Sequence, residues 1–500
     1  MTLADRRTFL RKSTLIAGGA IVAPSLSGLV ACNDVMAPPS PAGKILPRAG
    51  RGSGSYGPLV PAGPELALPA GFQYVKFGVE GTPMFDGNVT PKAHDGMATF
   101  EFGRVREDFE DDDDDRSHGK QRRIRLVRNH EMRGAGPAMG NPALAYDARG
   151  SGGTTTLEVL QEQDGSLVCG PNGAPLVRDW VSLGGSHVNC AGGRTPWQSW
   201  ITSEETFDAP SATGFQKAHG YNFDVPVWSD TQVAAIPLPR MGRFSHEAVA
   251  VDPRSGIVYQ TEDRRYRPRT AANLGAGFYR FVPDSPGDVH HGVLEMLKVR
   301  GEPNYNTTSG QTVGQPLDVE WVLIDEPDPQ PFTPDGYDVY RQGLGKGGAI
   351  FDRLEGCWYG DASIYFVVTN GGDAELGQVW QYRPRGHRSG VLTLIFESPG
   401  AEVLDGPDNI CTTPRGGLIL CEDGDGEQYM RGLTARGEIF DFALNIYNDS
   451  EFAGACFSPN GRTLFVNIQG NTSPATPPGS NPLALGMTFA IWGPWKNGAL

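Results

Sequence analysis

The chain has 500 residues and a formal net charge of -15 at pH 7, with a sequence pI near 5.1. This acidity argues against a nucleic-acid partner, because phosphate backbones are bound by clustered Lys and Arg side chains, and it suits a protein that binds cations. Hydrophobic residues make up 39% and charged residues 20%, as in ordinary globular proteins, while 67 Gly and 40 Pro predict one large domain with many turns.

The N-terminus is typical of an export signal. Arg6 and Arg7 precede an apolar stretch over 15–30 that is broken by glycines, a proline and serines, so the pattern indicates a twin-arginine signal and not a membrane span. The stretch runs into Leu29-Val30-Ala31-Cys32, which resembles a lipoprotein cleavage box and would place a lipid on Cys32. We expect three parts: a signal peptide over 1–32, a flexible linker over 33–64 and a folded domain over 65–500.

These features predict where the protein resides. Export by the twin-arginine route would take the folded chain to the periplasm or the cell surface. Membrane contact would then occur only through the lipid on Cys32, and we expect the domain itself to be a monomer.

One spacing recurs along the domain. In three segments an ionisable residue lies 15 residues before an acidic residue that closes a short β-branched or aromatic run: Cys190 and Glu205, Glu247 and Glu262, Asp408 and Asp423. Further copies start at Asp95, Glu355 and Ala453, so the period is about fifty residues. Repeats of this length built from short strands are typical of propellers, in which each unit is one four-stranded blade. We predict an all-β fold, namely a six-bladed β-propeller with loop insertions, of which the acidic run 110–115 is one.

The shared register has a chemical consequence. Corresponding positions of the blades lie at corresponding depths. The ionisable residue that starts each copy would therefore point into one central channel. The alternative is that they are turn and strand-end residues that face water.

Cys190 is a candidate metal ligand, because it leads through a glycine turn into a short strand that ends on Glu204 and Glu205. The alternative is that it is a small buried hydrophobe. Four histidines lie near the same segments but without a paired-His or HExxH spacing, which is typical of side chains that hydrogen-bond to ligands and do not bind metal themselves: His94, His130, His187 and His246. A Ser-His-Asp hydrolase would need a Gly-x-Ser-x-Gly turn, which the sequence lacks.

Several motifs occur together and in one order from about residue 70 to the C-terminus. They are Asn129-His130-Glu131, Asn189-Cys190-Ala191-Gly192-Gly193-Arg194-Thr195-Pro196-Trp197, Ser203-Glu204-Glu205, Gly242-Arg243-Phe244-Ser245-His246-Glu247, Asp352-Arg353-Leu354-Glu355, Gly406-Pro407-Asp408-Asn409 and Gly461-Arg462-Thr463-Leu464-Phe465-Val466-Asn467-Ile468-Gln469. With these motifs the chain resembles the PhoX family of exported alkaline phosphatases.

The resemblance implies a six-bladed propeller whose channel holds ferric iron and calcium and hydrolyses phosphate monoesters. Cys190 would be a thiolate on iron, and Arg353 would hold the substrate phosphate, so these two are the expected catalytic residues. The remaining expected ligands are carboxylates on iron or calcium, namely Glu205, Glu247, Glu355 and Asp408. These residue types agree with the chemistry, because a thiolate suits iron and carboxylates suit both ions.

The chain also departs from the family pattern near the expected site. A glutamate expected before the last strand is absent or replaced by Glu451, since the segment reads Glu451-Phe452-Ala453. We regard the chain as a divergent member and keep two hypotheses. The first is a metal-dependent phosphomonoesterase acting on small phosphate esters; the second is a lipid-anchored propeller that serves as a binding scaffold, with structural metal or none.

Overall fold

The structure is a computed structural model that describes residues 54–105, 121–170, 175–210, 214–268, 270 and 272–500. The expected signal peptide, Cys32 and the acidic run 110–115 lie outside these residues. No helix in the described part of the chain combines the length and apolar character needed to cross a membrane.

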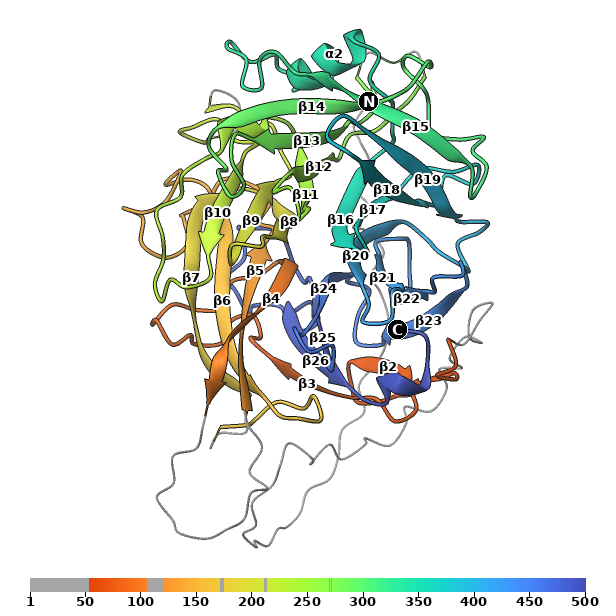
Figure 1. The fold of residues 1–500 in the computed structure, drawn as a ribbon. Helices are drawn as coiled ribbons and strands as arrows, with labels where there is room; N and C mark the ends of the chain where they lie inside the picture. The colour runs from red at the N-terminus through yellow and green to blue at the C-terminus, as the bar shows by residue number, and fades with distance from the viewer. Residues whose placement is uncertain (1–53, 106–120, 171–174, 211–213, 269, 271) are drawn as a thin grey trace, which may run out of the picture.

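The described chain is almost entirely antiparallel sheet, in five sheets that surround a common centre (Figure 1). The first sheet holds β4 (His94–Val105), β5 (Gln121–His130), β6 (Gly152–Gln161) and β7 (Leu176–Ser186). A three-stranded sheet follows, with β8 (Asn189–Arg194), β9 (Ser199–Glu204) and β10 (Asn222–Pro226).

The third sheet has nine strands in the order β11-β12-β13-β14-β15-β19-β18-β17-β16. Its strands are β11 (His246–Val251), β12 (Val258–Glu262), β13 (Phe278–Pro283), β14 (Gly292–Val299), β15 (Pro316–Leu323), β16 (Leu354–Gly360), β17 (Ser363–Val368), β18 (Gln378–Arg385) and β19 (Ser389–Glu397). The short helix α2 (Asp338–Gly345) lies in the connection between β15 and β16, and the 3-10 turn η1 (Pro239–Met241) precedes β11.

The last two sheets join the two ends of the described chain. One has the order β1-β2-β23-β22-β21-β20, with β1 (Leu59–Pro61), β2 (Leu66–Pro69), β20 (Pro407–Thr412), β21 (Leu418–Glu422), β22 (Tyr429–Leu433) and β23 (Ile439–Asn445). In the other, β3 (Gln73–Phe77) pairs with β26 (Met487–Trp492) beside β25 (Thr463–Ile468) and β24 (Phe452–Phe457), and the turn η2 (Trp495–Asn497) follows. The first three strands of the described chain thus complete the two sheets formed by its last strands, and this pairing closes the ring of sheets.

These sheets confirm the all-β, propeller-like architecture. The division into six blades stays a prediction, because one sheet continues unbroken over nine strands and another has three. Strand β1 lies inside the segment expected to be a linker, where it pairs with β2.

The strands read as nearly continuous apolar runs because both of their faces are buried. In β25, Leu464 and Val466 face the core shared with the neighbouring β20–β23 sheet, whereas Phe465 faces the core shared with β4–β6 on the other side. Successive side chains of a strand point to opposite faces, so each sheet contributes to the cores on both sides of it. The apolar burial between sheets holds the circle together.

Six strands line the centre of the molecule, and each contacts the next in the order β4, β8, β11, β16, β20, β24 and back to β4 (Figure 1). We call them the inner strands. Every inner strand has a register shift at or immediately after its second residue. Such β-bulges bend a strand and re-aim a side chain.

Small residues allow the inner strands to approach closely next to these bulges. A Cβ atom added to Gly96 would lie 2.6 Å from Ala191 Cα, and one added to Gly356 would lie 2.6 Å from the Asp408 carbonyl oxygen. Gly454 is more restricted still, since its Cβ would lie 2.3 Å from the Asp95 carbonyl oxygen and its φ is +64°. The inner strands therefore meet backbone to backbone around the centre.

This close approach can be measured by comparing two glycines. Gly437 has φ +81° like Gly454, but a Cβ atom there would meet nothing within 4 Å. Gly437→Ala should therefore cost only the left-handed backbone strain, about 1–2 kcal/mol. Gly454→Ala should cost about 2 kcal/mol more, because its methyl group meets fixed backbone. Urea unfolding of the two variants measures the difference, and equal losses of stability would contradict the close packing of the inner strands.

Candidate metal centre

Two sets of residues meet at one end of the inner strands. The first set is the second residue of each inner strand, which we call the anchor: Asp95, Cys190, Glu247, Glu355, Asp408 and Ala453. The second set is the first residue after the strand that follows each inner strand: Glu131, Glu205, Asp263, Thr369, Asp423 and Gln469. Antiparallel pairing brings the start of one strand beside the end of the next, so both sets lie at the same edge of the sheets.

Three groups of potential metal ligands form within these sets. In each group one oxygen or sulfur atom of every residue lies within 4.8 Å of the others. The groups are Glu131 with Cys190 and Glu205, Cys190 with Glu247 and Asp408, and Asp408 with Asp423 and Glu451. Because Cys190 and Asp408 each belong to two groups, the three groups form one continuous cluster, which we call the carboxylate–thiol cluster.

Four of the five expected ligands lie in this cluster, namely Cys190, Glu205, Glu247 and Asp408. The fifth, Glu355, lies beside it and is held by Arg353, whose Nη2 is 2.6 Å from Glu355 Oε1. Burial together with Asp408 and Glu247 raises the pKa of Glu355, although Arg353 opposes the shift. The structure therefore brings all five residues together, while their roles as ligands stay a prediction.

The cluster residues are suited to bind cations. Both carboxylate oxygens of Glu247 are buried and lack a hydrogen-bond partner, as does Asp408 Oδ1. A buried carboxylate without donors is costly unless it is protonated or binds a cation. Hard oxygen ligands suit calcium and ferric iron, and the added thiol of Cys190 suits iron.

Buried charge dominates the electrostatics of the cluster. Burial raises the pKa of Cys190, and the carboxylates of Asp95 and Glu247 raise it further. Burial and its acidic neighbours also raise the pKa of Asp408, to about 7, and that of Asp423 to about 6. A bound cation would reverse these shifts, because it favours the deprotonated thiol and carboxylates.

Two arginines border the cluster. Arg353 donates from Nε and Nη2 to the carboxylate of Asp263, at 2.9 and 3.1 Å, in addition to its ion pair with Glu355. Arg133, which the sequence analysis did not consider, pairs through Nη2 with Glu131 and with Glu205, the latter at 3.1 Å. The two arginines have one signal in common, since each lies two residues from a clustered glutamate.

Two strand-end acids do not belong to the cluster. Glu262 accepts hydrogen bonds from the Tyr279 hydroxyl and the Gly277 amide, at 2.8 and 2.9 Å, so it faces away from the cluster. Asp263, the next residue, takes its place against Arg353. The turn between β11 and β12 (252–257) is one residue longer than that between β20 and β21 (413–417), so the spacing of 15 misses the position by one.

Glu204 is the second acid that lies outside the cluster. Its carboxylate accepts hydrogen bonds from His219 Nδ1 at 2.7 Å and from the backbone amides of His187 and Gly220 at 2.9 and 2.8 Å. It fixes a loop of its own sheet, while its neighbour Glu205 faces the cluster. The last residue of the second strand thus serves the fold, and the residue after it reaches the centre.

The segment before the last inner strand supplies an acid despite Ala453. Glu451 precedes β24 and lies in one group with Asp408 and Asp423. Gln469 also reaches the centre and donates from Nε2 to Asp95 and to Glu131, at 2.8 and 2.7 Å.

Two of the nearby histidines bond to backbone carbonyls and a hydroxyl group, and not to the expected metal ligands. His130 bonds the Lys92 carbonyl oxygen and the Thr155 hydroxyl, and His246 bonds the Gly242 carbonyl oxygen. Among the described residues, no histidine belongs to a group of potential metal ligands.

The raised pKa values predict how the metal-free protein responds to pH. The folded state keeps protons on Asp408 and Asp423 that the unfolded chain releases near pH 4. Because folded pKa values above the unfolded ones favour folding at low pH, the free energy of unfolding should fall as the pH rises from about 4 to about 7. Urea unfolding of chelator-treated protein at pH 5.5 and pH 8 tests this sign.

Calcium should raise the melting temperature more at pH 8 than at pH 5.5, since it binds deprotonated carboxylates. Asp408→Asn should weaken the pH dependence, whereas Asp449→Asn, at an exposed position, should not. Equal stability of the metal-free protein at the two pH values would contradict the shared buried charge.

Known proteins share the fold and the family of this chain. The structure is similar to that of Pseudomonas fluorescens PhoX in complex with vanadate, a transition state analogue, with a TM-score of 0.60 and 17% identity over 88% of this chain and 98% of that chain. A glucose dehydrogenase gives a TM-score of 0.32 with 14% identity over 64% of this chain and 77% of that chain. Among curated proteins, none matches the sequence. The family model for alkaline phosphatase PhoX matches residues 54–471, and the chain therefore belongs to the PhoX family.

Proposed function

We propose that the protein is a metal-dependent phosphomonoesterase with a six-bladed propeller fold, and that the carboxylate–thiol cluster holds ferric iron and calcium. The observation that carries the proposal is the meeting of Cys190 with many buried carboxylates, several of them without hydrogen-bond donors, beside two arginines. Membership of the alkaline phosphatase PhoX family supports the reaction class. The vanadate bound by the Pseudomonas fluorescens relative is consistent with phosphoryl chemistry at such a site.

The arginines supply the binding of the phosphoryl group in this proposal. Arg353 uses Nε and Nη2 for Asp263 and Glu355, which orient its guanidinium and leave Nη1 without a partner among the described residues. Arg133 uses Nη2 for its carboxylates, and its side chain is 52% exposed. Each arginine can therefore donate from its remaining nitrogens to a phosphoryl oxygen that enters from solvent.

The cluster residues divide the remaining tasks. Cys190, Glu205, Glu247, Glu355 and Asp408 would hold the ions, with Asp423 and Glu451 as further carboxylates. The bound ions would neutralise charge on the phosphoryl group and lower the pKa of an attacking water. Gln469 keeps Asp95 and Glu131 in place through its two hydrogen bonds.

Arg353→Lys should lower kcat/KM for an aryl phosphate by about tenfold to a thousandfold while iron and calcium contents stay unchanged. Lysine keeps the charge but loses the planar fork that binds Asp263 and a phosphoryl oxygen together. A matched control is Arg254→Lys, since Arg254 forms a similar two-nitrogen pair with Asp252, at 2.9 and 2.7 Å, outside the cluster. Phosphate release and elemental analysis give the two readouts.

Unchanged activity in Arg353→Lys would place phosphate binding elsewhere. If fully metal-loaded wild-type protein hydrolysed no phosphomonoester in a panel, the phosphatase proposal itself would fail and the scaffold hypothesis would be favoured.

Cys190→Ser should remove iron and its visible absorbance while the protein stays folded. Cys190 contributes a sulfur atom to the cluster, and the serine hydroxyl is a poorer ligand for iron. Cys411→Ser provides the control, because Cys411 is equally a free, buried cysteine but lies in the apolar core. Iron content of purified variants, with circular dichroism as the test of folding, decides the question; iron retained in Cys190→Ser would mean that the residue is only a buried side chain.

Export completes the proposal. The paired Arg6 and Arg7 and the segment ending in Cys32 support delivery by the twin-arginine route to the periplasm or cell surface, with a lipid on Cys32 as the membrane contact of a monomer. Cell fractionation of the full chain and of Cys32→Ala tests this, since loss of the lipid should move the protein from the membrane to the soluble fraction.

A further inference from the structure

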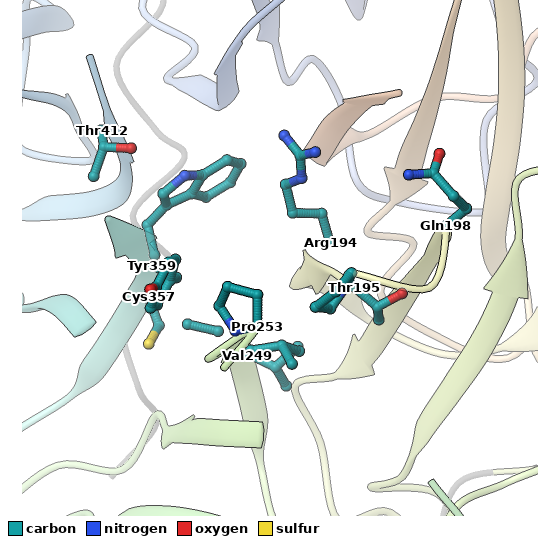
Figure 2. A pocket seen from close by; sticks show the side chains of 12 residues that line it. Arg194, Thr195, Gln198, Val249, Pro253, Cys357, Tyr359 and Thr412 are labelled. Carbon is teal, nitrogen blue, oxygen red and sulfur yellow. The ribbon is translucent and has the colours of Figure 1, made fainter. Parts of the chain in front are cut away.

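A cavity of about 340 Å3 lies at the opposite end of the inner strands from the carboxylate–thiol cluster (Figure 2). Its lining comes from the last residues of these strands and the turns that follow them, including Arg194 of β8, Val251 of β11, Tyr359 of β16 and Thr412 of β20. Cys190 and Arg194 lie on the same strand, so the cavity and the cluster are about 13 Å apart along it. The cavity is within the size range of small-molecule sites.

The two ends of the inner strands do not share an open passage. The space between them is a cavity of about 10 Å3, lined by small residues such as Gly96, Ala191 and Gly356 and by Trp358. This volume holds about one water molecule. A substrate at the cluster therefore cannot reach the far cavity through the centre, and any ligand of the far cavity would arrive from its own side.

Arg194 gives the far cavity a positive charge. Its guanidinium forms no ion pair among the described residues, and its Cζ lies 5.7 Å from the centroid of the Phe100 ring. The lining includes no aspartate or glutamate. Asp252, next to the lining residue Pro253, is already paired with Arg254. Arg194 therefore leaves a positive charge in this recess, in a chain whose net charge is -15.

Polar groups and rings surround Arg194. Figure 2 shows its guanidinium projecting into the cavity between Thr412 and Gln198. Neither of these side chains, nor the Tyr359 hydroxyl, has a hydrogen-bond partner within the described ranges, so each can bond a ligand. Trp358 and Tyr359 add aromatic surface to the lining, and Trp358 is fixed by packing against the core residues of several sheets.

We propose that this cavity is a second ligand site, which binds a small anion attached to a planar aromatic group. Arg194 binds the anion through its fork of N–H donors, assisted by Gln198 and Thr412. The rings of Trp358 and Tyr359 contact the planar group. The site is independent of the phosphatase reaction, because it uses none of the cluster residues.

Isothermal titration calorimetry of the metal-loaded full chain tests the proposal, with 2-naphthoate as the probe. Naphthoate should bind saturably, whereas 2-naphthamide, which has the ring without the charge, and acetate, which has the charge without the ring, should each bind at least about tenfold more weakly. Arg194→Gln should weaken naphthoate binding at least about tenfold, and Tyr359→Leu several-fold. Arg300→Gln, at an exposed arginine elsewhere, should leave the affinity unchanged.

Aryl phosphate hydrolysis should stay within about twofold of wild type in Arg194→Gln, since Arg194 takes no part in that reaction. The proposal is overturned if naphthoate does not bind, if naphthamide or acetate binds equally well, or if Arg194→Gln keeps full affinity. Loss of naphthoate binding in Arg353→Lys would also overturn it, because the probe would then be at the carboxylate–thiol cluster. Arg194→Lys, which keeps the charge without the fork, should retain part of the affinity and serves if the Gln variant does not fold.

Discussion

The close approach of the inner strands is the constraint on which the rest of the structure depends. Glycine at 96, 356 and 454 lets backbone meet backbone around the centre, where a single methyl group would collide with a carbonyl oxygen or a Cα atom. The bulge at the second residue of each inner strand then turns the anchor side chain into the small space that remains. Apolar burial between neighbouring sheets compensates for this crowding and closes the circle through β3 and β26.

Crowding also explains the chemistry of the cluster. Anchors and strand-following residues arrive from all sides, and the described residues offer them too few hydrogen-bond donors, so carboxylates such as Glu247 remain without a partner. Arg133 and Arg353 neutralise part of the charge at the rim. Protons or cations are the remaining means of stabilising such a set of acids, so a cation bound here would couple the function of the site to the stability of the fold.

The same strands carry opposite charge at their two ends. At one end four of the six anchors are acidic, and at the other end β8 presents Arg194 beside aromatic and hydroxyl side chains. Backbone packing and Trp358 separate the two ends, leaving room for about one water molecule. A propeller-like ring thus offers two faces to solvent that can bind different ligands without exchanging them.

Local signals in the sequence were enough to predict much of this. Turn residues and β-branched runs predicted the strands, and the repeated spacing located Cys190, Glu247 and Asp408, because in these three repeats the inner strand, the turn and the next strand together span nearly equal lengths. Where one turn is a residue longer, the spacing pointed to Glu262, and the folded chain places Asp263 at the centre instead. Arg133 and Arg194 carry no periodic signal. The role of Arg133 depends on Glu205 from another part of the chain, and that of Arg194 depends on the absence of an acidic residue from the lining of its cavity. The merging of strands into a nine-stranded sheet likewise depends on long-range pairing between β15 and β19. The spacing along the chain determines which residues lie at one edge of their own sheet. Which residues of other sheets they contact there depends on how all the sheets close into a ring.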